Sequence, residues 1–110
     1  MKIIKEEKND IFLLKIDGKL DAHSAPKVEI EISKAISDGS KKIMINMEKV
    51  NYISSAGLRV LLLAAKDIKE KKGKIVIYSM SDVVDKIFKI SGFSTIFELC
   101  DTEAEAMKCF

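Results

Sequence analysis

The sequence predicts a single α/β domain, in which a mixed sheet of four or five strands is covered by about four helices. A nearly continuous apolar run at residues 43–47 has the length and composition of a strand buried on both faces. An amphipathic helix is expected at residues 56–72, and another apolar run follows at residues 74–78. Strand, helix and strand within about 36 residues form a βαβ unit, whose strands are parallel and whose crossover is right-handed.

The segment before this unit is expected to contribute a hairpin and a helix. Apolar residues at 3–4 and at 11–16 flank a polar turn and can pair as two strands, with the second strand ending at residues 17–18. Ser24, followed by a proline two residues later, is a typical helix start, and Gly39 is a typical helix end.

The segment after the unit is expected to complete the sheet. Gly73 is expected to supply the residue that ends the central helix. Ser81 caps a short helix that ends at Gly92. The apolar face of this helix is predicted to be Val83, Val84, Ile87 and Phe88. Residues 96–99 read as a short last strand, and residues 102–105 offer a capping box for a closing helix.

The composition is that of an ordinary globular protein. We expect it to form one domain over residues 1–110. Apolar residues make up 47% and charged residues 33% of the chain, and the net charge of +2 does not point to nucleic acid or to an anionic membrane. No apolar run is long enough to cross a bilayer, and no signal peptide is seen. The two cysteines, Cys100 and Cys109, have no metal-ligand spacing, so we expect free thiols and a cytoplasmic location.

The residue types that enzymes need are sparse. His23 is the only histidine, and no Gly-x-Ser-x-Gly elbow surrounds a serine, which argues against Ser-His-Asp hydrolysis. The five glycines lie too far apart for a phosphate-binding loop, and one histidine with two distant cysteines makes no metal site. We therefore expect no catalytic residue, cofactor or metal. A small enzyme or nucleotide-binding domain of similar topology stays open as an alternative.

Residues 50–63 join the central strand to the central helix and carry the candidate site. Ser54 or Ser55 can cap the helix by accepting a hydrogen bond from a backbone N–H one turn later. Unpaired N–H groups and the positive end of the helix dipole favour negative charge at this point. Ala56 and Gly57 have little or no side chain, so another protein could approach the serines closely. An ordinary N-cap remains the simpler interpretation.

The string Val-x-Tyr-Ile-Ser-Ser-Ala-Gly-Leu-Arg-Val-Leu-Leu at residues 50–62 resembles the signature of the STAS domain of bacterial anti-sigma factor antagonists. In that family a Ser or Thr in an Asp-Ser-Ser/Thr-Gly-Leu context is phosphorylated, and the matching position here is Ser55. Ser54 stands where Asp is common, and Ala56 stands where a second hydroxyl residue is common. The stretch at residues 18–21 resembles the family's Gly-x-Leu-Asp segment, which implies that Asp21 lies near the phosphorylated serine and contacts the kinase.

This resemblance implies a phosphorylation-controlled binding protein and not an enzyme. The unphosphorylated form is expected to bind an anti-sigma factor, itself a serine kinase with a GHKL-type ATPase fold, and so to free the sigma factor. Phosphorylation of Ser55 would end the complex, and a PP2C-type phosphatase would restore the binding form. The expected partner-binding residues are Asp21, Ser54, Ser55, Ala56 and Gly57. A STAS module that is never phosphorylated and serves as a scaffold in another signalling complex is the alternative.

Overall fold

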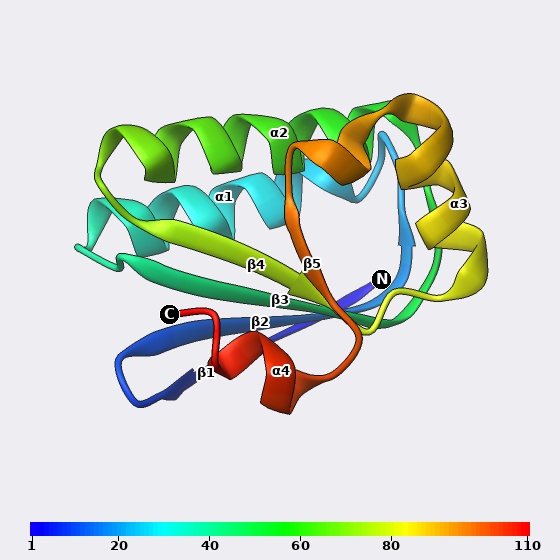
Figure 1. The fold of residues 1–110 in the computed structure, drawn as a ribbon. Coiled ribbons are helices and arrows are strands. Elements are labelled where there is room, and N and C mark those ends of the chain that lie inside the picture. The colour runs from blue at the N-terminus through cyan, green and yellow to red at the C-terminus, as the bar shows by residue number, and fades with distance from the viewer.

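The computed structural model describes all residues from Met1 to Phe110 as one five-stranded sheet with helices on both faces (Figure 1). In chain order the elements are β1 Lys2–Lys8, β2 Ile11–Leu20, α1 Ala25–Ser37, β3 Lys42–Ile53, α2 Ser55–Glu70, β4 Lys74–Tyr78, α3 Asp82–Ser91, a 3₁₀ turn at Phe93–Thr95, β5 Glu98–Cys100 and α4 Glu103–Met107. The strands lie in the order β1-β2-β3-β4-β5. Only β1 is antiparallel to its neighbour; the other pairs are parallel. The predicted mixed α/β fold is confirmed.

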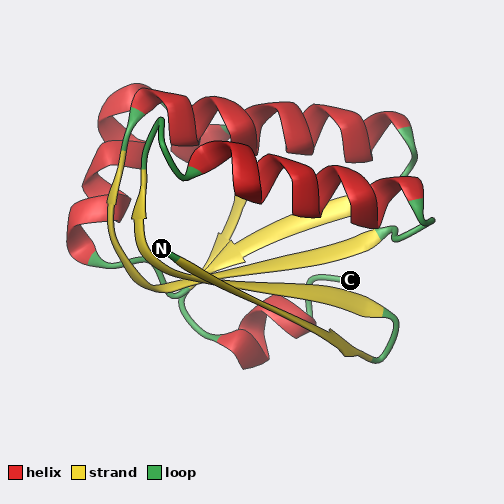
Figure 2. Cartoon of the chain, turned by 180° about the vertical axis from the view of Figure 1, so that it is seen from behind, coloured by secondary structure: helices red, strands yellow, loops and turns green.

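The sheet is buried on both faces at its centre. Helices α1 and α2 lie side by side over one face with α3 beside them, and α4 covers part of the other face (Figures 1 and 2). Alternate residues of β4 divide between the two sides: Ile75 and Ile77 join the larger core under α1–α3, whereas Val76 and Tyr78 pack with Ala106 of α4. This alternation confirms that the central strands are covered on both sides, as their apolar runs predict.

The hairpin at the start of the chain is longer than predicted. Asn9 and Asp10 both have positive φ angles (51° and 61°), which matches the two-residue turn that suits the twist of paired strands. The prediction that the second strand stops at residues 17–18 is wrong, because β2 continues to Leu20. The register of β2 against β3 shifts on both sides of Asp17–Gly18, and Gly18 adopts a φ of 119°. Gly18 therefore marks a bulge inside the strand and not its end.

One glycine and one valine of the C-terminal half also differ from expectation. The left-handed residue after α2 is Lys72 (φ 63°), not Gly73. Gly73 is required for another reason: a Cβ there would lie 2.5 Å from the carbonyl oxygen of Lys41. Val83 is 54% exposed, so α3 buries Val84 and Phe88 without it. Gly92, with a φ of 80°, ends α3 as predicted.

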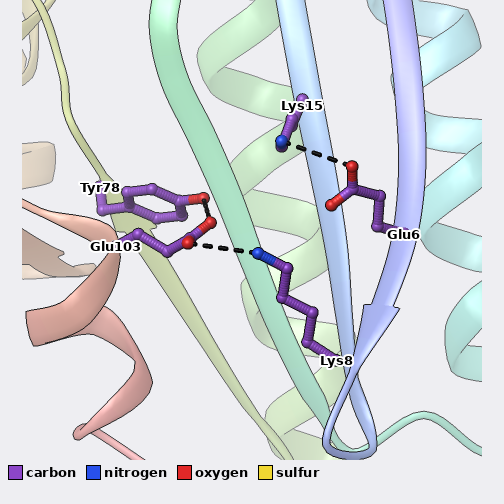
Figure 3. Close-up of polar contacts among 5 residues, drawn as sticks. All are labelled: Glu6, Lys8, Lys15, Tyr78 and Glu103. Carbon is purple, nitrogen blue, oxygen red and sulfur yellow. Dashed lines mark hydrogen bonds and ion pairs between the residues drawn. The ribbon is translucent and has the colours of Figure 1, made fainter.

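A small polar network fastens α4 to the sheet (Figure 3). The hydroxyl of Tyr78 donates to Glu103 Oε1 at 3.0 Å, and Lys8 Nζ lies 3.3 Å from Glu103 Oε2. Burial, together with this carboxylate, raises the pKa of Tyr78. Burial alone would raise the pKa of Glu103, but the bonds from Tyr78 and Lys8 outweigh it and lower that pKa. Beside the network, Lys15 pairs with Glu6 across the hairpin at 3.4 Å. No helix is both long and apolar enough to span a bilayer.

Candidate functional site

The ends of β2 and β3 meet at one edge of the sheet and bring the candidate residues together. Leu20 pairs with Ile53 in the parallel register, and the backbone N–H of Ser54 donates to the carbonyl of Leu20 at 2.9 Å. Asp21 and Ser54 are therefore the residues that directly follow two adjacent, hydrogen-bonded strand ends. The sequence places them more than thirty positions apart, and the parallel pairing makes them neighbours.

Gly57 allows this approach. It is buried in the first turn of α2, and a Cβ at this position would lie 2.6 Å from the carbonyl oxygen of Leu20 and 2.9 Å from Ile53 Cγ1. Only a glycine lets the start of α2 pack this closely on the end of β2. The absent side chain thus serves packing within the fold. We expected Gly57 to leave room for another protein. The structure instead gives an internal reason for a glycine here, which is the close contact with Leu20 and Ile53.

The two serines have different environments. Ser54 is the N-cap of α2, and its Oγ accepts a hydrogen bond from the backbone N–H of Gly57 at 3.3 Å. Ser55 is the first residue of the helix; it is exposed, and its hydroxyl makes no hydrogen bond within the protein. The first turn contains no acidic residue, so nothing on the helix offsets the positive end of its dipole. Ser54 therefore performs the capping role, and Ser55 leaves its hydroxyl open to solvent.

Asp21 is held in a tight turn that leads into α1. Its Oδ1 accepts hydrogen bonds from the backbone N–H groups of His23 (3.0 Å) and Ser24 (3.1 Å). The Ser24 N–H is the main reason that the pKa of Asp21 lies below its ordinary value. Ser24, buried, donates its hydroxyl to the carbonyl of Lys19 at 2.7 Å. Asp21 thus offers a fixed, ionised carboxylate at the same edge as the serines, and His23 is exposed, as expected.

A groove between α1 and α2 begins at Ser55. It is lined by Ala25 and Glu29 from α1 and by Ser55, Ala56, Arg59, Val60 and Leu63 from α2. Arg59 is the only arginine of the chain. It lies one helical turn after Ser55 and takes part in no ion pair or side-chain hydrogen bond. Sequence reasoning did not single out Arg59, although its spacing of four residues from Ser55 predicts that the two share a helix face.

Comparison with known proteins decides the family. The model of the STAS domain family matches residues 2–106. The anti-sigma-B factor antagonist of Listeria monocytogenes is 30% identical over 102 residues, which cover 93% of this chain and 90% of that protein. The chain belongs to the STAS domain family. Its curated relatives include proteins named anti-sigma factor antagonists.

Solved structures show the same fold for the STAS domain described here. An anti-sigma factor antagonist from Mycobacterium paratuberculosis superposes with a TM-score of 0.89 at 18% identity, over 98% of this chain and 92% of that one. The anti-sigma factor antagonist SpoIIAA in its unphosphorylated form gives a TM-score of 0.77 at 23% identity, over 97% and 96% of the two chains. Phosphorylated SpoIIAA from Bacillus gives 0.76 at 24% identity, over 97% of each chain.

Proposed function

We propose that this STAS domain is an anti-sigma factor antagonist that is switched off by phosphorylation of Ser55. In its unphosphorylated form it binds an anti-sigma factor and so releases the sigma factor. The anti-sigma factor is a serine kinase of the GHKL-type ATPase fold, which transfers phosphate from ATP to Ser55 and then dissociates. A PP2C-type phosphatase returns the protein to its binding form. The domain acts by binding and not as an enzyme, and we place it in the cytoplasm.

One observation carries this proposal: of the two adjacent serines, only Ser55 has an exposed hydroxyl without an intramolecular partner. A kinase needs a hydroxyl that it can reach, and modification of Ser55 breaks no hydrogen bond of the fold. Ser54 is occupied as the N-cap, and its loss would cost helix stability. The curated relatives named anti-sigma factor antagonists support the choice of partner.

Phosphorylation at this point would change binding without changing the fold. A phosphate adds about −1.5 to −2 charges at neutral pH, and the start of a helix favours negative charge. A partner packed along the groove from Ala56 to Leu63 would instead meet added bulk and a charge that must lose its water. Each 1.4 kcal/mol of such a penalty lowers affinity about tenfold. The unphosphorylated and the phosphorylated form of SpoIIAA both share the fold of this chain, with TM-scores of 0.77 and 0.76, which supports a modification that the fold tolerates.

The second candidate function is a STAS scaffold that is never phosphorylated. It is favoured by Ser54, which stands where Asp is common and which uses its side chain to cap α2. Asp21 supplies a carboxylate at the same edge of the sheet, but its Oδ1 is engaged by backbone N–H groups. Under this alternative the site binds its partner at all times.

Two measurements test the proposal. The first incubates the protein with ATP and the anti-sigma kinase encoded nearest to its gene. We expect the mass to rise by one phosphate on Ser55 and to stay unchanged in the Ser55→Ala variant. Tight binding without any mass increase would favour the scaffold. The second compares partner affinity for Ser55→Asp and the matched, uncharged Ser55→Ala. We expect Ser55→Ala to bind like the wild type and Ser55→Asp to bind at least about tenfold more weakly, with the same circular dichroism spectrum.

A further inference from the structure

Two thiols meet at the sheet edge that carries β5. Cys100 is the last residue of β5, and Cys109 follows the end of α4. Their Sγ atoms lie 3.3 Å apart, and both residues are partly buried. These are the only cysteines of the chain. The spacing of nine residues carries no recognisable motif, so only the folded structure reveals that the two thiols are in contact.

Contacts with β4 position the backbone at both cysteines. Cys100 pairs with Tyr78 in the β4–β5 ladder. On the other side, Lys74 Nζ donates to the carbonyl of Cys109 at 2.6 Å and pairs with Glu98 at 2.6 Å. Both contacts involve residues of β4, so this strand holds the backbone of Cys100 and of Cys109 close together.

We propose that Cys100 and Cys109 form an intramolecular disulfide when the protein meets a peroxide. An S–S bond is about 2.05 Å long, so the two sulfurs must approach each other by roughly 1.3 Å, which small side-chain rotations can deliver. The bond closes a short loop that contains α4. It is a modification site separate from Ser55, because α4 and β5 form the layer and edge away from the start of α2 (Figure 1).

The reaction needs peroxide as its only oxidant. In the first step a thiolate attacks one peroxide oxygen; an S–O bond forms, the O–O bond breaks and hydroxide leaves. In the second step the other thiolate attacks the sulfenic sulfur; the S–S bond forms, the S–O bond breaks, and the oxygen leaves as water after taking up a proton. Two thiols and one hydrogen peroxide thus yield one disulfide and two waters. Burial and the contact with the Cys109 thiol raise the pKa of Cys100 to about 11, which disfavours Cys100 as the first attacking thiolate.

The test treats the reduced, full chain with hydrogen peroxide and then digests it with trypsin without reductant. Lys108 separates the two cysteines, so cleavage after it leaves Cys109–Phe110 attached to the peptide of residues 90–108 only if the disulfide has formed. We expect the intact mass to fall by that of two hydrogen atoms and the thiol titre to fall from two to zero. Dithiothreitol should release the dipeptide and restore both thiols.

Cys100→Ser and Cys109→Ser serve as matched controls. We expect each variant to keep the fold and to gain oxygen or form a disulfide-linked dimer, without an intramolecular loss of two hydrogen atoms. In the wild type, the oxidised form should melt at a higher temperature than the reduced form, because the closed loop restricts the unfolded chain. A wild-type product that is a disulfide-linked dimer, that only gains oxygen, or that keeps both thiols under conditions that oxidise dithiothreitol would overturn the proposal. None of these outcomes depends on a kinase or on Ser55.

Discussion

Replacement of Gly57 by Ala tests how the site edge is assembled. The new Cβ would lie 2.6 Å from the Leu20 carbonyl oxygen, whereas ordinary van der Waals contacts begin at 3.4 Å. That oxygen cannot yield easily, because it accepts the N–H of Ser54 at 2.9 Å. Overpacking of this kind costs about 1–3 kcal/mol. Because the contact is with backbone, we expect the upper end of this range, about 3 kcal/mol. Alanine regains about 1 kcal/mol through its helix propensity, which leaves a net loss of about 2 kcal/mol.

Urea unfolding measures the loss, and amide hydrogen exchange locates it. For a domain of this size a loss of 1 kcal/mol lowers the melting temperature by about 4–8 °C. The Ser54 amide should also exchange faster, because its bond to Leu20 is stretched. Gly39→Ala is the control: its Cβ meets nothing within 4 Å, and its left-handed φ of 100° makes the strain purely local. If Gly57→Ala is as stable as the wild type, or is destabilised with unchanged Ser54 exchange, the packing argument is refuted.

Four further substitutions probe the cap, the network of α4 and the end of α2. Ser54→Ala should cost about 1 kcal/mol of unfolding free energy, since it removes the N-cap. Tyr78 has a raised pKa, so wild-type stability should fall as pH rises above the ordinary tyrosine value of 10.0, and Tyr78→Phe should lose less stability over that range. Lys72→Gly should be neutral or stabilising because it relieves a left-handed φ of 63°, whereas Gly73→Ala should destabilise by about 1–3 kcal/mol.

Each of these substitutions has an outcome that would contradict its reasoning. Asp is also a good N-cap residue, so Ser54→Asp should keep most of the wild-type stability. If Ser54→Ala and Ser54→Asp lose the same free energy of unfolding, the loss does not come from the missing cap. Equal alkaline slopes for Tyr78→Phe and the wild type would mean that Tyr78 ionises alike in the folded and unfolded states. A large loss for Lys72→Gly would show that the backbone there is not strained.

Helices and strands could be predicted from the sequence where a local pattern of apolar residues matches the burial of those residues in the fold. The apolar run 43–47, the strand Lys74–Tyr78 and the cap at Ser81 all lie where their composition predicts. Capping rules placed the serine pair at the start of α2 but left open which serine caps. In the structure Ser54 is the cap, because its Oγ accepts the hydrogen bond from the backbone N–H of Gly57.

The remaining features depend on contacts between distant residues, which periodicity does not encode. Gly18 breaks a strand pattern and so reads as an end, although β3 pairs with β2 on both sides of the bulge. Gly57 and Gly73 are glycines because Leu20 and Lys41 approach them from other elements. The contact between Cys100 and Cys109 likewise arises only when β5 joins β4.

The strand order β1-β2-β3-β4-β5 has a consequence for the chain as it leaves the ribosome. Each strand adds to the edge that the preceding strands already present, so the sheet can grow outward in the direction of synthesis. The face of the sheet that α4 covers is completed later. Val76 and Tyr78 stay uncovered until α4 has emerged and docked on them. The nascent domain therefore displays an apolar surface until α4 is available to cover it, and this surface can associate with other chains during that time.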